Sequence, residues 1–230
     1  MSIHFDWTDY FDGYVKNVKM QKIEIKDESV GQAAFAIGYE TNALGNQSFA
    51  GGLRSIAKGS AAFAFGNDVT ASANQAIAMG NNTTASKTGA VALGADTTAS
   101  GKYSIALGKN TEATMPHAFA NGINTKATQS HAIALGSNSN AKGIASLAFG
   151  DTNNAEKAYT WALGQGNTVN AIHSLAVGRD NTTNGRFNFA FGEGNTTNGD
   201  YAVAIGANAT ANEKTTVIKN DKIRLMGNDI

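Results

Sequence analysis

One four-residue motif recurs at a fixed 14-residue period through most of this chain: a large apolar residue, Ala, a variable residue and Gly. Thirteen copies follow one another without insertion or deletion. Their closing glycines are Gly38, Gly52, Gly66, Gly80, Gly94, Gly108, Gly122, Gly136, Gly150, Gly164, Gly178, Gly192 and Gly206. Such a period is typical of a solenoid, in which each repeat is one coil that buries its apolar face by stacking on its neighbours.

Residues 131–144 show what one coil contains. Ala132, Ile133, Ala134 and Leu135 alternate small and large, which predicts a strand with two apolar faces, buried on both sides. The polar half after Gly136 predicts a second strand with one inward Ala, five residues after the closing Gly. That inward alanine recurs as Ala43, Ala57, Ala71, Ala85, Ala99, Ala113, Ala127, Ala141 and Ala155.

Glycines are expected at both corners of the coil. The closing Gly permits the positive φ of a tight corner. A second glycine, seven residues later in several coils, is expected at the opposite corner: Gly45, Gly59, Gly101, Gly143, Gly185 and Gly199. Thirteen coils at strand spacing predict a rod of roughly 60 Å.

A coil this short has room for one layer of side chains, so one apolar face of the first strand needs an outside cover. The chain offers nothing else of that length, and we expect a second copy to provide it. We assign the invariant alanines, named here the Ala column, to this interface because small side chains let backbones approach closely. The Ala column is Ala36, Ala50, Ala64, Ala78, Ala92, Ala106, Ala120, Ala134, Ala148, Ala162, Ala176, Ala190 and Ala204. The reverse assignment, with the Ala column inside, stays open at this point.

The amino-acid composition limits which kinds of partner the chain can bind. The formal net charge is +0, so there is no global basic field to attract nucleic acid. No apolar run reaches the length of a membrane span, and residues 1–7 lack the basic and apolar regions of a signal peptide. The absence of Cys excludes disulfides and thiolate metal sites.

No catalytic constellation can be assembled from the sequence. His117, His131 and His173 share one slot, five residues before the closing Gly, and are expected at a polar corner rather than around a metal. Asp and Glu are scattered without a pairing spacing. Recurrent threonines, such as Thr83 and Thr97, are expected as solvated strand residues. We therefore expect no enzyme activity, no metal and no cofactor.

The two ends differ from the repeats. Residues 1–30 are expected to be a cap or docking segment, because five aromatic residues lie within ten positions: Phe5, Trp7, Tyr10, Phe11 and Tyr14. Such a cluster either anchors into a partner's pocket or covers the first coil. Residues 31–212 form the repeats, and residues 213–230 are expected to form a C-terminal strand pair or tip.

Several repeats resemble a known family. The phrases at 90–94 (Ala-Val-Ala-Leu-Gly), 104–108 (Ser-Ile-Ala-Leu-Gly) and 202–206 (Ala-Val-Ala-Ile-Gly) are similar to the head repeats of trimeric autotransporter adhesins. The resemblance covers about residues 31–212. It implies a left-handed parallel β-roll of the YadA type and a homotrimer of three rolls packed side by side.

The rest of such an adhesin has no counterpart, because no signal peptide, heptad stalk or anchoring barrel is recognisable. We therefore expect a bacteriophage fibre or spike, docked to a virion protein through its N-terminal end and binding a host surface protein or glycan by multivalent contact. The alternatives are the head of a bacterial surface adhesin and a purely structural capsid decoration.

Overall fold

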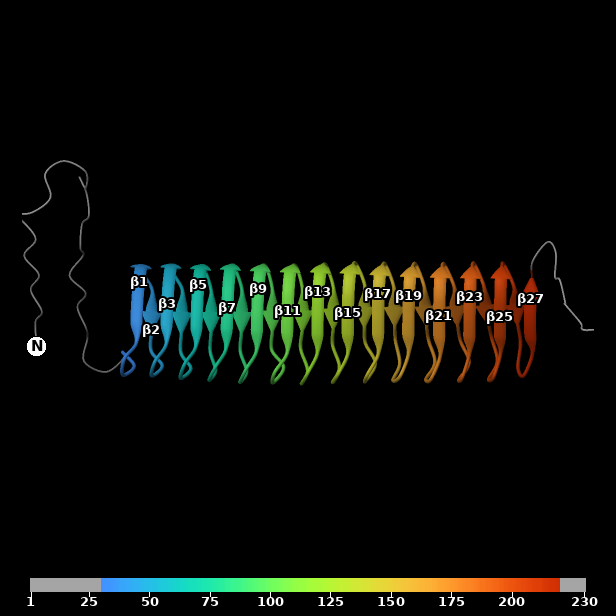
Figure 1. Cartoon of the computed structure of the whole chain (residues 1–230), viewed down its shortest axis with the longest axis horizontal. Helices are drawn as coiled ribbons and strands as arrows, with labels where there is room; N and C mark the ends of the chain where they lie inside the picture. The colour runs from blue at the N-terminus through green and yellow to red at the C-terminus, as the bar shows by residue number, and fades with distance from the viewer. Residues whose placement is uncertain (1–29, 220–230) are drawn as a thin grey trace, which may run out of the picture.

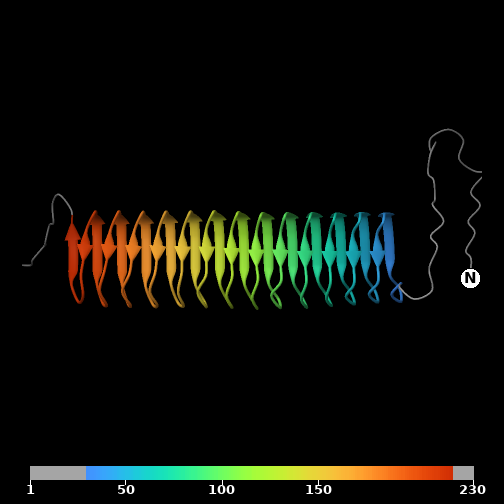
Figure 2. The same ribbon diagram turned by 180° about the vertical axis from the view of Figure 1, so that it is seen from behind.

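The computed structural model describes residues 30–219, and within that range it consists of β-strands joined by short turns. The coils stack into a straight rod with β1 at one end and β27 at the other (Figure 1). The stack is equally regular when it is seen from behind (Figure 2). The expected all-β parallel solenoid of about 13 coils is therefore confirmed.

Long and short strands form two separate sheets, and neighbouring strands in each sheet run parallel. The long strands are β1 (Phe35–Tyr39), β3 (Phe49–Leu53), β5 (Phe63–Asn67), β7 (Ile77–Asn81), β9 (Val91–Ala95), β11 (Ile105–Lys109), β13 (Phe119–Ile123), β15 (Ile133–Ser137), β17 (Leu147–Asp151), β19 (Trp161–Gln165), β21 (Leu175–Arg179), β23 (Phe189–Glu193), β25 (Val203–Ala207) and β27 (Thr216–Lys219). The short strands are β2 (Asn42–Ala43), β4 (Ile56–Ala57), β6 (Thr70–Ala71), β8 (Thr84–Ala85), β10 (Thr98–Ala99), β12 (Glu112–Ala113), β14 (Lys126–Ala127), β16 (Asn140–Ala141), β18 (Asn154–Ala155), β20 (Thr168–Val169), β22 (Thr182–Thr183), β24 (Thr196–Thr197) and β26 (Thr210–Ala211).

The corners lie beside the closing glycines rather than on them. In the coil of β9, the left-handed positions are Asp96 (φ 53°) and, before the next long strand, Tyr103 (φ 55°). Gly94 itself lies inside β9 with φ +132°, where a Cβ would collide with the carbonyl oxygen of Gly108 in the next coil. The expected corner at the closing Gly is therefore wrong: this glycine has its positive φ inside the strand, and close stacking of the coils excludes any side chain there.

The second set of glycines lies in the turns at the opposite corner, as expected. These glycines are required because neighbouring coils approach closely, not because their φ is positive. At Gly59 an added Cβ would collide with the backbone of Ala73 in the next coil, and the same kind of collision occurs at Gly143. Close backbone approach between coils thus fixes glycine at both sites.

Strand register follows the sequence period. Residue i pairs with residue i+14 from β1 through β25, for example Ala106 with Ala120. The last pair is one position shorter, because Val203 lies opposite Thr216. β27 thus extends the long sheet past residue 212, whereas the expected strand pair also involved residues 220–230, which lie outside the described part of the chain.

The coil interior holds four columns of small side chains. Two come from the long-strand side, two and four residues before each closing Gly, and two come from the short-strand side, three and five residues after it. Ala62, Ala64, Val69 and Ala71, for example, fill one coil and are at most 2% exposed. The interior is therefore one thin layer, as expected from the short repeat.

This thin interior overturns the assignment of the Ala column to an interface. From Ala50 to Ala204 its members are 0% exposed within a single chain, so they cannot contact a second copy. The two sheets lie too close for larger residues, and Ile, Leu and Phe are forced to the outside. The expectation of solvated threonines is also wrong for one column, because Thr83, Thr97 and their equivalents are fully buried.

The polar content of the interior changes along the rod. Asn153, Asn167, Asn181 and Asn195 are buried at successive coils, and each Oδ1 accepts a hydrogen bond from the backbone N–H of the residue 14 positions later. The hydroxyls of Thr83, Thr97, Thr111 and Thr125 occupy the same column nearer the N-terminus without a hydrogen-bond partner. The described C-terminal half thus contains an internal asparagine ladder that the other half lacks.

Candidate interaction surfaces

An apolar strip runs along the outside of the long-strand sheet. We define it as the side chains one and three positions before each closing Gly, from β1 to β25. Its members include Phe149, Trp161 and Phe191, which are 54%, 51% and 50% exposed. A patch of large apolar side chains extending along the whole rod greatly exceeds the few hundred Å² that soluble monomers usually expose. The strip is therefore the strongest candidate interaction surface in the described chain.

Two members of the strip depart from the apolar pattern. Gly51 lies under the ring of Phe65, and a Cβ there would meet the Phe65 ring at 2.7 Å, so the glycine makes room for the aromatic side chain. Asn121 is an exposed amide in β13, with Leu107 and Leu135 as its in-register neighbours.

A second feature, which we call the aromatic ledge, follows the corner before the long strands. Tyr159, His173, Phe187 and Tyr201 stack on one another with ring centroids 5.0–5.1 Å apart and nearly parallel planes. Each of the four has a positive φ, which is rare for bulky residues, and stacking of about 0.5–1.5 kcal/mol per pair offsets part of that strain. The rings thus present their edges to solvent.

The expected shared slot of the histidines is confirmed. His117 stacks on His131 with centroids 5.1 Å apart, and Tyr103 continues that stack at 5.7 Å from His117. In residues 30–219 no group of three His, Cys, Asp or Glu side chains is placed to hold a metal ion. The histidines therefore take the place of aromatic rings in a stack.

Charged residues form pairs between adjacent coils on the exposed surface. Arg54 donates to both carboxylate oxygens of Asp68 at 2.6 Å, and this hydrogen bonding holds the pKa of the Asp68 carboxyl below its ordinary value. The pKa of Asp200 is lowered first by the backbone N–H of Arg186 and then by its guanidinium, which lies 2.9 Å away. These pairs connect residues 14 positions apart and follow the register of the coils.

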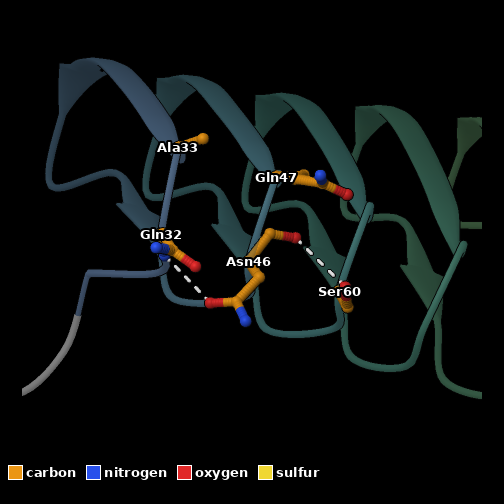
Figure 3. A pocket seen from close by; sticks show the side chains of 5 residues that line it. All are labelled: Gln32, Ala33, Asn46, Gln47 and Ser60. Carbon is orange, nitrogen blue, oxygen red and sulfur yellow. Dashed lines mark hydrogen bonds between the residues drawn. The ribbon is translucent and has the colours of Figure 1, made fainter.

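A shallow polar depression lies near the first coils (Figure 3). Its lining is neutral and consists of Gln32, Ala33, Asn46, Gln47 and Ser60. The Asn46 Oδ1 accepts from the Gln32 backbone N–H at 2.9 Å, and the Ser60 hydroxyl donates to the Asn46 carbonyl at 3.3 Å. These groups form hydrogen bonds between successive coils. They offer neither a nucleophile with its base nor a charged ligand set.

Other expectations concern the ends of the chain and the membrane. The five aromatic residues assigned to partner docking, Phe5, Trp7, Tyr10, Phe11 and Tyr14, lie outside the described residues. Among residues 30–219 there is no helix with the length and apolar character needed to cross a membrane.

The repeats match the model of a known protein family. The family model of the YadA head domain repeat (2 copies) matches residues 29–55, 57–83, 71–97, 85–111, 113–139 and 189–209, which together make up more than half of the chain. The matches fall on the stacked coils that carry both the apolar strip and the thin interior. No curated protein matches the sequence.

Proposed function

The chain belongs to the YadA head domain repeat family, and from this membership we propose that it forms a homotrimeric adhesive rod. Three rolls lie side by side with their axes parallel, and their apolar strips face one another. The remaining surfaces of the rod bind a partner on a cell surface, either a protein or a glycan.

The observation that carries the proposal is the apolar strip. Each coil places one or two large apolar side chains on the outside of the long strand, while its own interior accepts only small ones. Burial of such a side chain contributes about 1.5–3 kcal/mol, so covering the strip along the whole rod is strongly favourable. A second copy supplies a surface of the same length and the same 14-residue spacing.

Adhesion by such a rod is multivalent. Three copies of every surface feature lie on one trimer, and several trimers on one particle or cell raise the avidity without a strong single site. The aromatic ledge and the polar faces of the coils are the surfaces that remain available for a partner when the strips are covered.

The trimer is tested by measuring the mass of the full chain in solution with light scattering. Wild-type protein is expected at the mass of three chains. Leu107→Arg places a charge in the covered strip and is expected to weaken the trimer, so that folded single chains with an unchanged β-sheet circular dichroism spectrum appear on dilution. The matched control Thr98→Arg lies on the opposite sheet and is expected to stay trimeric. A wild-type protein with the mass of one chain overturns the proposal.

Two settings accommodate the rod, a bacterial surface adhesin head and a virion fibre. Family membership favours the bacterial surface, whereas the cluster of aromatic residues near the N-terminus favours docking to a particle. Immunogold labelling with an antibody against residues 31–212 distinguishes them by the location of the label. For the virion setting, deletion of residues 1–17 is expected to abolish incorporation into particles.

A further inference from the structure

The apolar strip contains one polar side chain in the middle of the rod. Asn121 lies on β13, about halfway between β1 and β27 (Figure 1). Every other residue of the strip, from Phe35 to Ile205, is aliphatic, aromatic, Met or Gly. An asparagine is a poor strand residue at a position where Leu, Ile or Phe would suit both the strand and a covered face.

The side-chain amide of Asn121 has no hydrogen-bond partner in the part of the chain that the structure describes. No side-chain hydrogen bond of Asn121 occurs among the described residues, and its neighbours in the same column are Leu107 and Leu135. The residue beside the strip in this coil, directly after the closing Gly, is also apolar. Ile123 is 53% exposed there, whereas the equivalent positions in the adjacent coils are Lys109 and Ser137.

Covering the strip changes the requirement on this amide. In water it is solvated at no cost, but at a buried interface an amide needs a hydrogen-bond partner. In a parallel trimer with threefold symmetry, equivalent residues lie at the same level. The polar groups that reach Asn121 at its own level are therefore the Asn121 amides of the other two copies, and an amide both donates and accepts.

A repetitive rod needs such a feature because its axial register is otherwise poorly determined. Sliding one roll by a single coil, about 4.8 Å, brings each coil against the next one, whose apolar contacts are nearly the same. Only the end coils lose their neighbours. A single buried Asn sets register in coiled coils in the same situation, at a cost in stability.

We propose that the three Asn121 side chains form one hydrogen-bonded layer that fixes the axial register of the trimer. The proposal rests on the trimer proposed above. In a slipped trimer, an Asn121 amide lies against Leu107 or Leu135 of a neighbour and loses its partner, so slipped arrangements are disfavoured. The layer lowers the stability of the trimer while it selects one alignment among many.

The symmetry of the trimer provides the readout. When three chains are in register they are equivalent, and each methyl group has one NMR signal, whereas any slip makes them inequivalent and multiplies the signals. Met79 is a natural probe because its side chain belongs to the strip and is 38% exposed in the single chain. Methyl-labelled wild-type chain is expected to show one Met79 signal, which is assigned by its loss in Met79→Leu.

Asn121→Leu is expected to remain trimeric, to melt at the same or a higher temperature, and to show several Met79 signals. The double variant Asn121→Leu/Leu135→Asn moves the amide by one coil and is expected to restore a single Met79 signal. This rescue separates register selection from a local effect on β13.

Each failure points to a different step. One Met79 signal in Asn121→Leu overturns the register proposal and leaves the trimer intact, as does failure of the double variant to restore a single signal. Dissociation of Asn121→Leu also overturns it, because the amide would then hold the chains together rather than align them. A wild-type chain that is monomeric by mass refutes the trimer instead, so the two failures are distinguishable.

Discussion

Replacement of one asparagine of the internal ladder is expected to destabilise the rod far more than replacement of a threonine in the same column. The Asn167 Nδ2 donates to the Asn153 Oδ1, the Leu163 carbonyl and the Gly178 carbonyl at 2.8–3.0 Å. Its Oδ1 accepts from the backbone and the side chain of Asn181 at 3.0 and 2.9 Å. All of these bonds are lost in Asn167→Ala.

The expected loss follows from those contacts. Each net hydrogen bond contributes about 1 kcal/mol, and a buried N–H left without a partner, here that of Asn181, costs about 1–3 kcal/mol. The Asn167 amide has two hydrogens to donate and also accepts from the Asn181 side chain, so three bonds at about 1 kcal/mol each and the unpaired Asn181 N–H give an expected loss of about 4–6 kcal/mol in the free energy of unfolding for Asn167→Ala. Thr97→Ala removes a hydroxyl that has no partner, so its loss is limited to about 1 kcal/mol from the missing methyl group.

The assay is urea unfolding followed by circular dichroism at one fixed chain concentration, since association contributes to the apparent stability. Hydrogen exchange of the backbone amide of Asn181 reports the same loss locally. If Asn167→Ala and Thr97→Ala destabilise the protein equally, the ladder does not contribute as its hydrogen bonds indicate, and the reasoning is refuted.

Three further perturbations test other features of the rod. Gly94→Ala forces a Cβ into the carbonyl of the next coil at φ +132° and is expected to cost at least about 3 kcal/mol, seen as a lower melting temperature; an unchanged value contradicts the stacking argument. Ala106→Arg is expected to prevent folding because this side chain is fully buried within one coil, whereas Leu107→Arg only weakens association. A folded Ala106→Arg chain, detected by circular dichroism, would show that this burial is wrong. Arg186 lowers the pKa of Asp200, so the ion pair stabilises the folded chain fully above the ordinary Asp pKa of about 3.9 and loses this effect as the pH falls through the lowered value. The melting-temperature difference between wild type and Asp200→Asn should therefore shrink between pH 6 and pH 3, and a constant difference contradicts the argument.

The repeat predicted most of the fold because a fixed period constrains every coil in the same way. Ala106 pairs with Ala120 since both occupy the same place in the 14-residue unit, and the same holds from β1 to β25. Only the last strand departs, where the period has already ended in the sequence and the pairing is one position shorter.

The prediction for the Ala column was wrong because the alternation of small and large residues shows that the strand has two apolar faces but not which face points into the coil. The deciding quantity is the space between the sheets, which admits Ala64 but not Phe65. That limit was present in the sequence, since no aromatic residue ever occupies the column that ends in Ala204, whereas the other face accepts Phe and Trp. Side-chain volume, read column by column, identifies the inside of a thin coil.

The internal polar columns could also have been found. Thr83 lies two positions before the inward Ala85, so both side chains had to point to the same side of the extended chain. Asn153, Asn167, Asn181 and Asn195 recur at the coil period, as expected of a ladder of buried amides. The aromatic ledge follows from the same period, because Tyr159, His173, Phe187 and Tyr201 lie 14 residues apart in the slot of the histidines. The left-handed backbone that carries these rings was not predicted.

The 14-residue register also determines how the rod yields to force. Hydrogen bonds between coils run along the rod axis, so tension applied at the two ends pulls coils apart one after another. Each released coil frees one whole repeat of chain, about 45–50 Å when extended, in exchange for about 4.8 Å of rod. Each coil that unfolds therefore yields about ten times its folded length as extended chain, so the rod lengthens under force in many small steps.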